Sequence, residues 1–161
     1  MKSIIKIIGV ALLMTAFTQI ASAQVKFSAG ADIGMVTNEG LGLTYGLALG
    51  GEYQIGDNMG ITLQSGFSIV SNDYDGVSSS FIPYMAGFKY YFDSNEGGLY
   101  ALAQIGMTSY SVSSSGGTYL SYAPGVGYLM NEHIDLGFRY HIITSDGESL
   151  NWLALRAAYQ F

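Results

Sequence analysis

Hydrophobic and polar residues alternate with a period of two along most of the chain. In residues 41–55, for example, Leu43, Tyr45 and Leu47 fall on one face, and small or polar residues fall on the other. A β-strand sends successive side chains to opposite faces, whereas a helix would scatter these residues around its axis. The alternation predicts eight strands, each long enough to cross a bilayer when tilted. They are residues 25–36, 41–55, 59–71, 81–92, 99–112, 119–130, 134–144 and 151–161.

The ionised residues within these segments all fall on the face that carries small and polar side chains. They are Lys26, Asp32, Glu52, Lys89, Asp135, Arg139 and Arg156. A Lys or Arg on a lipid-facing surface at the middle of a bilayer would cost about 2–4 kcal/mol. The segregation therefore predicts that the apolar face meets lipid and that the charged face lines a closed interior.

Connections of two kinds separate the predicted strands. Residues 56–58, 93–97 and 131–133 are short and rich in turn-forming types, whereas residues 72–80, 113–118 and 145–150 tend to be longer and rich in Ser, Gly and Asp. Residues 38–40 are the exception, a short connection where a long one is expected. Because an open sheet edge in hydrocarbon leaves costly unpaired backbone groups, the last strand must pair with the first. We predict an all-β fold, an eight-stranded antiparallel up-and-down transmembrane barrel.

The N-terminal residues have a different pattern. Lys2 and Lys6 are followed by an apolar run over residues 7–20 and then by Ala21-Ser22-Ala23. A positive segment, an apolar run and a small-x-small site are typical of a secretory signal peptide. The alternative is a transmembrane helix, since residues 4–23 just suffice to span a bilayer. We predict a signal peptide over residues 1–23 and one barrel domain over residues 24–161.

Composition narrows the classes of function. Only 11% of residues are charged, less than the roughly 25% of a soluble globule, although the only long apolar run is the N-terminal one. A barrel resolves this conflict because its hydrophobicity is distributed by alternation. Without residues 1–23, four basic residues face twelve acidic ones, a net charge of about −8 that argues against nucleic acid as a partner. The absence of cysteine excludes a disulfide framework.

The chain resembles the small eight-stranded outer-membrane β-barrel proteins of bacteria, such as the transmembrane domain of outer membrane protein A and the OmpX-like barrels. The resemblance rests on the signal peptide, the eight alternating segments and the alternating apolar ending of residues 155–161. It implies an outer-membrane location, with the short turns on the periplasmic side. It also implies that Tyr159 and Phe161 belong to an assembly signal read by the outer-membrane assembly machinery.

The inward charges, together with His141, form the candidate site, a lumen charge network. Arg139 and Arg156 need an acid nearby, for which Asp32 and Glu52 are the candidates. The network is either a gate or ion path, or a charge-paired plug, and we favour the plug because eight strands leave room only for side chains. The inward glycines similarly indicate either a ligand cavity or, as we favour, relief of crowding.

We expect no catalytic residue, no metal site and no cofactor. The two histidines are His133, in a predicted turn, and His141, which shares a strand face with Asp135 but lies about 20 Å from it. That separation is too large for a hydrogen-bonded dyad. A hydrolase site in which a loop Ser or Asp146 approaches His141 is a minor alternative.

The leading functional hypothesis is a non-enzymatic, monomeric protein of the outer membrane with a structural or surface-interaction role. Its partners would be membrane lipid and lipopolysaccharide, met by loops around Asp73, Asp75, residues 113–117 and residues 146–148. The first alternative is a narrow pore or small-ligand passage. The second is a secreted, lipocalin-like barrel, which requires the apolar face to point inward.

Overall fold

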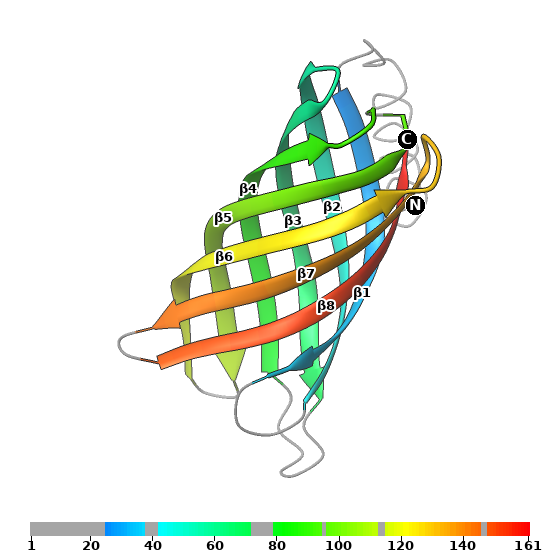
Figure 1. Cartoon of the computed structure of the whole chain (residues 1–161). Coiled ribbons are helices and arrows are strands. Elements are labelled where there is room, and N and C mark those ends of the chain that lie inside the picture. Colours follow the sequence, from blue (N-terminus) through cyan, green and yellow to red (C-terminus); the bar gives the residue numbers. More distant parts are fainter. Residues whose placement is uncertain (1–24, 38–41, 72–78, 95, 113–114, 146–147) are drawn as a thin grey trace, which may run out of the picture.

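The computed structural model describes residues 25–37, 42–71, 79–94, 96–112, 115–145 and 148–161. These residues form eight β-strands that wind around one axis (Figure 1). The strands are β1 (Val25–Val36), β2 (Leu43–Gly56), β3 (Met59–Ser71), β4 (Ser79–Tyr91), β5 (Gly98–Val112), β6 (Ser115–Leu129), β7 (Ile134–Ser145) and β8 (Glu148–Gln160). Within this part of the chain no helix has the length and apolar character needed to cross a membrane.

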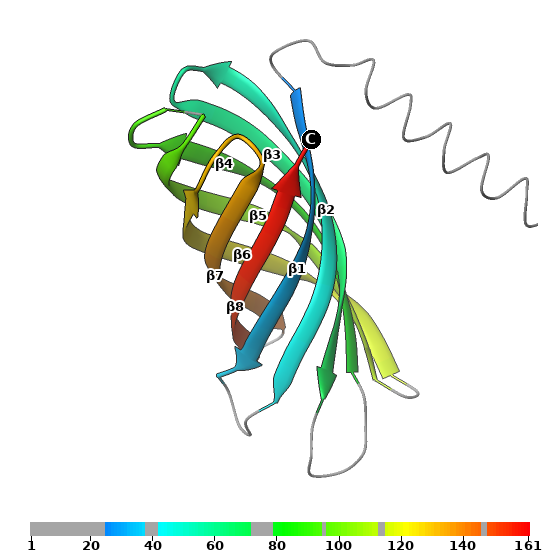
Figure 2. The same ribbon diagram turned by 90° about the vertical axis from the view of Figure 1, so that its right-hand side faces the viewer.

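Each strand pairs antiparallel with the next, and β8 pairs with β1, so the barrel is closed. Figure 2 shows β8 beside β1 along this seam. Asp32 lies opposite Arg156 in the seam, and the Phe161 amide donates a hydrogen bond of 2.8 Å to the Phe27 carbonyl. The predicted fold class is confirmed. The predicted signal peptide lies outside the described residues.

Two predicted loops are shorter than expected because the strands around them are longer. Strand β6 begins at Ser115 instead of residue 119, and its pairing with β5 continues to Val112 opposite Ser115. The hydroxyls of Ser109 and Thr118 also share a 3.0 Å hydrogen bond across this ladder. Strand β8 similarly begins at Glu148. The prediction of loops at residues 115–117 and at Glu148 was therefore wrong, because ladder pairing outweighs the turn preference of Ser and Gly.

The outer surface of the barrel is apolar, and the polar face points inward. Leu47 and Leu49, in the middle of β2, are each 69% exposed, whereas Glu52 on the opposite face is buried. A lipocalin-like barrel requires the reverse arrangement, so that alternative is wrong. Where lipid surrounds a barrel, this arrangement satisfies both the apolar and the ionised side chains.

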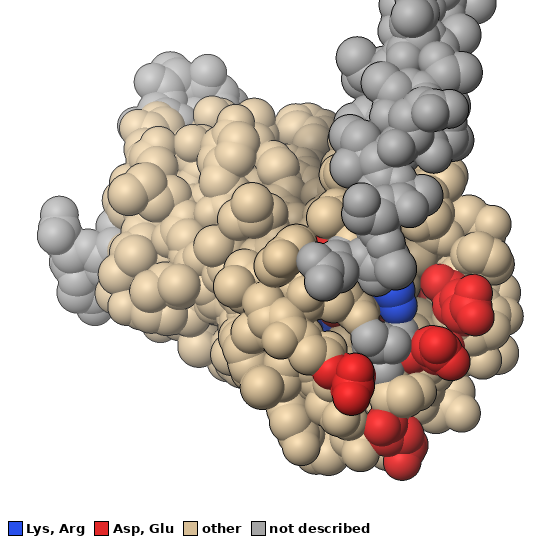
Figure 3. Space-filling view, turned by 90° about the horizontal axis from the view of Figure 1, so that it is seen from above, with Lys and Arg blue, Asp and Glu red and all other residues tan. Residues whose placement is uncertain are grey.

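The two ends of the barrel differ in their connections. We call the end with the β2–β3, β4–β5 and β6–β7 connections the turn end, and the opposite end the loop end. At the turn end, Gly98 has a φ of 102°, a conformation that other residues rarely adopt. Acidic residues gather at this end (Figure 3). The exposed acids of its connections are Asp57, Asp93, Glu96 and Glu132. Asp73, Asp75, residues 113–114 and residues 146–147 lie outside the described residues.

Candidate functional site

The lumen contains all the ionised strand residues that the alternation assigned to the inner face. Six of the predicted set are buried, and they are Glu52, Lys89, Asp135, Arg139, His141 and Arg156. Lys26, at the turn end, and Asp32, in the seam, are half-buried. These side chains occupy three layers from the turn end to the loop end, and each layer has its own chemistry.

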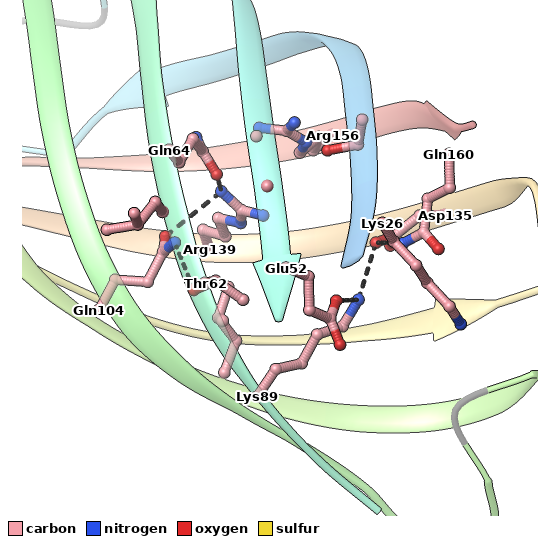
Figure 4. A pocket seen from close by; sticks show the side chains of 15 residues that line it. Lys26, Glu52, Thr62, Gln64, Lys89, Gln104, Asp135, Arg139, Arg156 and Gln160 are labelled. Atoms are coloured by element: carbon pink, nitrogen blue, oxygen red, sulfur yellow. Dashed lines mark hydrogen bonds and ion pairs between the residues drawn. The ribbon is translucent and has the colours of Figure 1, made fainter. Parts of the chain in front are cut away.

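The layer near the turn end is an ion-pair cluster around Lys89. The Lys89 Nζ lies 3.1 Å from Asp135 Oδ2 and 3.5 Å from Glu52 Oε2 (Figure 4). The Tyr91 hydroxyl donates to both Glu52 oxygens, at 2.7 and 2.9 Å, and the Tyr100 hydroxyl donates to Asp135 Oδ1 at 2.6 Å. The ammonium also lies 3.9 Å from the centre of the Tyr100 ring. We call these five residues the Lys89 cluster, in which every charge has a partner.

Glycine makes room for one of the two tyrosines. The side chain of Tyr100 crosses to the next strand and rests on Gly127, where any Cβ would overlap the ring. Its hydroxyl is 3.0 Å from the position of a Cβ at Gly137. The glycine pattern therefore relieves crowding at these positions, as expected. The role of Tyr91 and Tyr100 was missed because the sequence analysis followed ionised residues, although the alternation already places both on the inner face.

The middle layer contains the two arginines. The Arg139 Nη1 donates to Gln64 Oε1, and to Gln104 Oε1 at 3.4 Å (Figure 4). The Nε2 of Gln104 in turn donates to Thr62 Oγ1 at 3.3 Å. Among the described residues no ion pair joins either arginine to a carboxylate, since the two ion pairs found there both involve Lys89. Glu52 is thus not the partner that the sequence suggested. Asp32 lies opposite Arg156 in the seam and interacts electrostatically with both arginines, without forming an ion pair.

The layer near the loop end is aromatic and apolar. The Trp152 ring stacks on His141 with centroids 4.4 Å apart and on Phe81 at 5.3 Å, and Phe81 stacks on Tyr110 at 4.9 Å. We call the buried apolar part of this layer the aromatic cluster. It consists of Val36, Val70, Phe81, Ile143, Trp152 and Ala154. The sequence analysis did not predict this cluster. Period-two alternation places these residues on the inner, otherwise polar face, so their apolar side chains were the signal that could have revealed it.

Little open space remains between the layers. One cavity of about 30 Å³ lies between the Lys89 cluster and the arginines, and another of about 10 Å³ lies beside Asp32 and His141. The smaller is at the limit for a single water molecule. Within the described ranges no group of three or more His, Asp or Glu side chains is arranged to hold a metal ion.

The remaining predicted residues lie away from the lumen. Tyr159 and Phe161 are on the outer surface at the turn end, where Phe161 is 68% exposed and their rings meet edge to face at 5.2 Å. The His133 ring stacks on Tyr159 at 5.3 Å. His141 and Asp135 lie in different layers, one against Trp152 and the other in the Lys89 cluster, so the structure does not bring them together.

Comparisons with known proteins agree with this geometry. The model of a family described as outer membrane protein beta-barrel domain matches residues 8–161. No curated protein matches the chain.

Solved structures of small barrels are similar in fold. Neisserial surface protein A has a TM-score of 0.67 at 19% identity, over 84% of this chain and 95% of that one. The N-terminal β-barrel domain of Pseudomonas aeruginosa OprF has a TM-score of 0.65 at 16% identity, over 84% and 97%. The outer membrane enzyme PagL has a TM-score of 0.68 at 16% identity, over 81% and 97%.

Proposed function

The chain belongs to the outer membrane protein beta-barrel domain family, and from this premise we propose that it is a structural protein of the bacterial outer membrane with a plugged lumen and no catalytic activity. It would strengthen the membrane and present its loop end at the surface. The observation that carries the proposal is that side chains pack across the lumen at two levels, in the Lys89 cluster and in the aromatic cluster. An ion that moved along the barrel axis would have to separate the side chains of both clusters.

The two clusters oppose conduction for different reasons. Separating Lys89 from Asp135 and Glu52 would leave buried charges without partners, which costs about 3–5 kcal/mol. Opening the aromatic cluster would expose stacked rings and aliphatic side chains to water, which costs roughly 25 cal/mol for each Å² of apolar surface. The lumen of an eight-stranded barrel has no spare width to bypass either obstacle.

Export, assembly and contacts complete the proposal. The chain would reach the periplasm through a signal peptide over residues 1–23 and would be inserted as a monomer by the outer-membrane assembly machinery. Tyr159 and Phe161 support this role because both are exposed at the turn end, where a partner can reach them. Membrane lipid would contact the apolar outer face, and lipopolysaccharide would contact the loop end.

A narrow pore is the second candidate, because the middle layer is polar and contains two arginines. Single-channel recording in a planar bilayer separates the two proposals. We expect the wild type to show no steady conductance. A variant that removes both obstacles, F81A/W152A/K89A, should conduct, provided that its heat-modifiable migration on a gel shows a folded barrel.

Steady conductance of the wild type that rises in Arg139→Gln or Arg156→Gln would overturn the plug in favour of the pore. A silent F81A/W152A/K89A barrel that is folded would show that some other obstacle closes the lumen.

The absence of catalysis is tested separately, since one neighbour in fold is an enzyme. The ring of His141 is buried against Trp152, away from Asp135, which supports a packing role. We expect no turnover of a chromogenic ester by the folded protein in micelles. Hydrolysis that disappears in His141→Asn would contradict the proposal.

A further inference from the structure

The middle layer of the lumen has more positive than negative charge. Arg139 and Arg156 contribute two positive charges, and Asp32 contributes the single negative charge of that layer. Glu52 and Asp135 share the single ammonium of Lys89, so the Lys89 cluster has one negative charge in excess, but the oxygens of both carboxylates already contact Lys89 and accept hydrogen bonds from the two tyrosine hydroxyls. The middle layer itself has an excess of one positive charge, and neither of its arginines forms an ion pair with a carboxylate among the described residues.

Strand register brings the two arginines to the same place. Arg139 lies opposite Ala154 and Arg156 lies opposite Gly137 in the β7–β8 ladder, so the arginines are diagonal neighbours on the inner face. Diagonal positions of this kind are about 7–8 Å apart, within reach of long side chains. Both arginines line the cavity of about 30 Å³ (Figure 4).

Each guanidinium has a donor without an acceptor among the described residues. Arg156 is 4% exposed and its Nη1 has no hydrogen-bond partner, and Arg139 is 7% exposed and its Nε has none. An arginine stays protonated in proteins, so it cannot escape burial by losing its charge. A buried donor with no acceptor is costly, and more so when the donor belongs to a charged group.

The surroundings of the cavity suit a small anion. Its lining includes Ser28, Thr62 and Gln104, which can donate hydrogen bonds. Two carboxylates, Glu52 and Asp135, also line it, but the four cations around it, Lys26, Lys89, Arg139 and Arg156, outnumber them. Asp32 does not line this cavity and instead borders the smaller one beside His141. A space of this size accepts a particle comparable to one or two water molecules, which admits a halide and rejects sulfate or an organic anion.

We propose that the lumen contains an anion site, in which Arg139 and Arg156 together hold one monovalent anion of the size of chloride. The anion would accept hydrogen bonds from the two guanidinium groups and neutralise the excess charge of the layer. Its role would be to stabilise the packed interior. This site would be present whether or not the barrel conducts.

The experiment measures the thermal unfolding midpoint of the folded barrel in micelles, in sodium chloride and in sodium gluconate at equal ionic strength. Because an anion that binds only the native state stabilises it, we expect the Tm to be higher in chloride by roughly 3 °C or more. Arg156→Gln should abolish the difference. Asp57→Asn also changes the net charge by one unit, but this exposed residue does not line the cavity and both arginines are kept, so it should retain the difference.

A Tm that is equal in the two salts, or a difference that persists unchanged in Arg156→Gln, would overturn the proposal. If Arg156→Gln does not fold, the test is anomalous diffraction from crystals of the wild-type protein grown in bromide. An anomalous bromide peak between the two guanidinium groups supports the site, and its absence means that the cavity holds water only. None of these measurements involves conductance, so their failure is distinguishable from failure of the plug.

Discussion

Lys89 joins the buried side chains at the turn end of the lumen, because its ammonium contacts two carboxylates and two aromatic rings. Each of these partners comes from a different strand, namely β2, β4, β5 and β7. The sequence predicted that Lys89, Glu52 and Asp135 share the interior, because alternation fixes the face of a residue. It did not predict which of them meet, because pairing across the lumen depends on register and on height along the axis.

We expect Lys89→Met to destabilise the barrel by about 3–5 kcal/mol, because Glu52 and Asp135 would remain buried without their cation. Urea unfolding in micelles, followed by the fluorescence of the single tryptophan, Trp152, measures the free energy of unfolding. The triple variant K89M/E52Q/D135N removes the charges together and should recover much of the loss. A triple variant as unstable as the single one would show that lost packing, and not lost charge, is responsible.

Gly127→Ala should cost about 1–3 kcal/mol, since the new methyl group would overlap the Tyr100 ring and approach the Leu136 carbonyl oxygen at 2.7 Å. Gly51→Ala is the matched control, because a Cβ there meets only the Phe27 ring, at 3.8 Å. The same urea titration compares the two. Equal stability of both variants would exclude the packing role that we assign to Gly127.

At the scale of the strand, the period-two alternation determines where the strands lie and which side chains face inward. The alternation located all eight strands and the facing of β2, and it gave the ends of β1, β3 and the start of β7 correctly. It underestimated β6 and β8, because residues 115–118 and 148–150 have turn-like composition while their backbones continue a ladder. Composition reports the preference of an isolated segment, whereas a strand end is set by the length of its neighbours.

The outward face of β2 gives a depth-dependent test of the membrane arrangement. Leu47→Arg, near the middle of the strand, should destabilise the barrel by about 2–4 kcal/mol in lipid vesicles, because a charge there meets acyl chains. Tyr53→Arg, near the turn end of the same face, should cost only about 0–1 kcal/mol. Folding equilibria in vesicles measure both, and equal costs would argue against a bilayer centred on the strand.

At the scale of the whole molecule, the seam between β1 and β8 turns a sheet into a ring. It leaves no edge on which backbone groups would face hydrocarbon without partners. The cost of an open edge predicts this closure from the sequence, but the register of the seam does not follow from it. The contents of the loop end were missed for a related reason, since the aromatic cluster joins β1, β3, β4, β7 and β8 and exists only in the closed ring.

A disulfide across the seam tests both closure and register. Ala31 and Ala157 face each other on the outer surface, at a separation that suits a disulfide. We expect A31C/A157C to form the bond spontaneously after folding and to unfold at higher urea concentration than its reduced form. A31C/L155C is displaced by two residues and should form it poorly. Equal efficiency of the two pairs, measured by migration on a non-reducing gel, would contradict the register.

The seam also governs the order in which the molecule can be completed. Strand β1 is synthesised first among the eight strands, and one of its two neighbours in the barrel, β8, is synthesised last. Contacts between segments so distant along a chain form slowly. Before β8 pairs with β1, the incomplete sheet has two unpaired edges and an apolar outer face, and these features drive aggregation. The protein is therefore most prone to aggregation before β8 pairs with β1, and closure of the ring removes the unpaired edges.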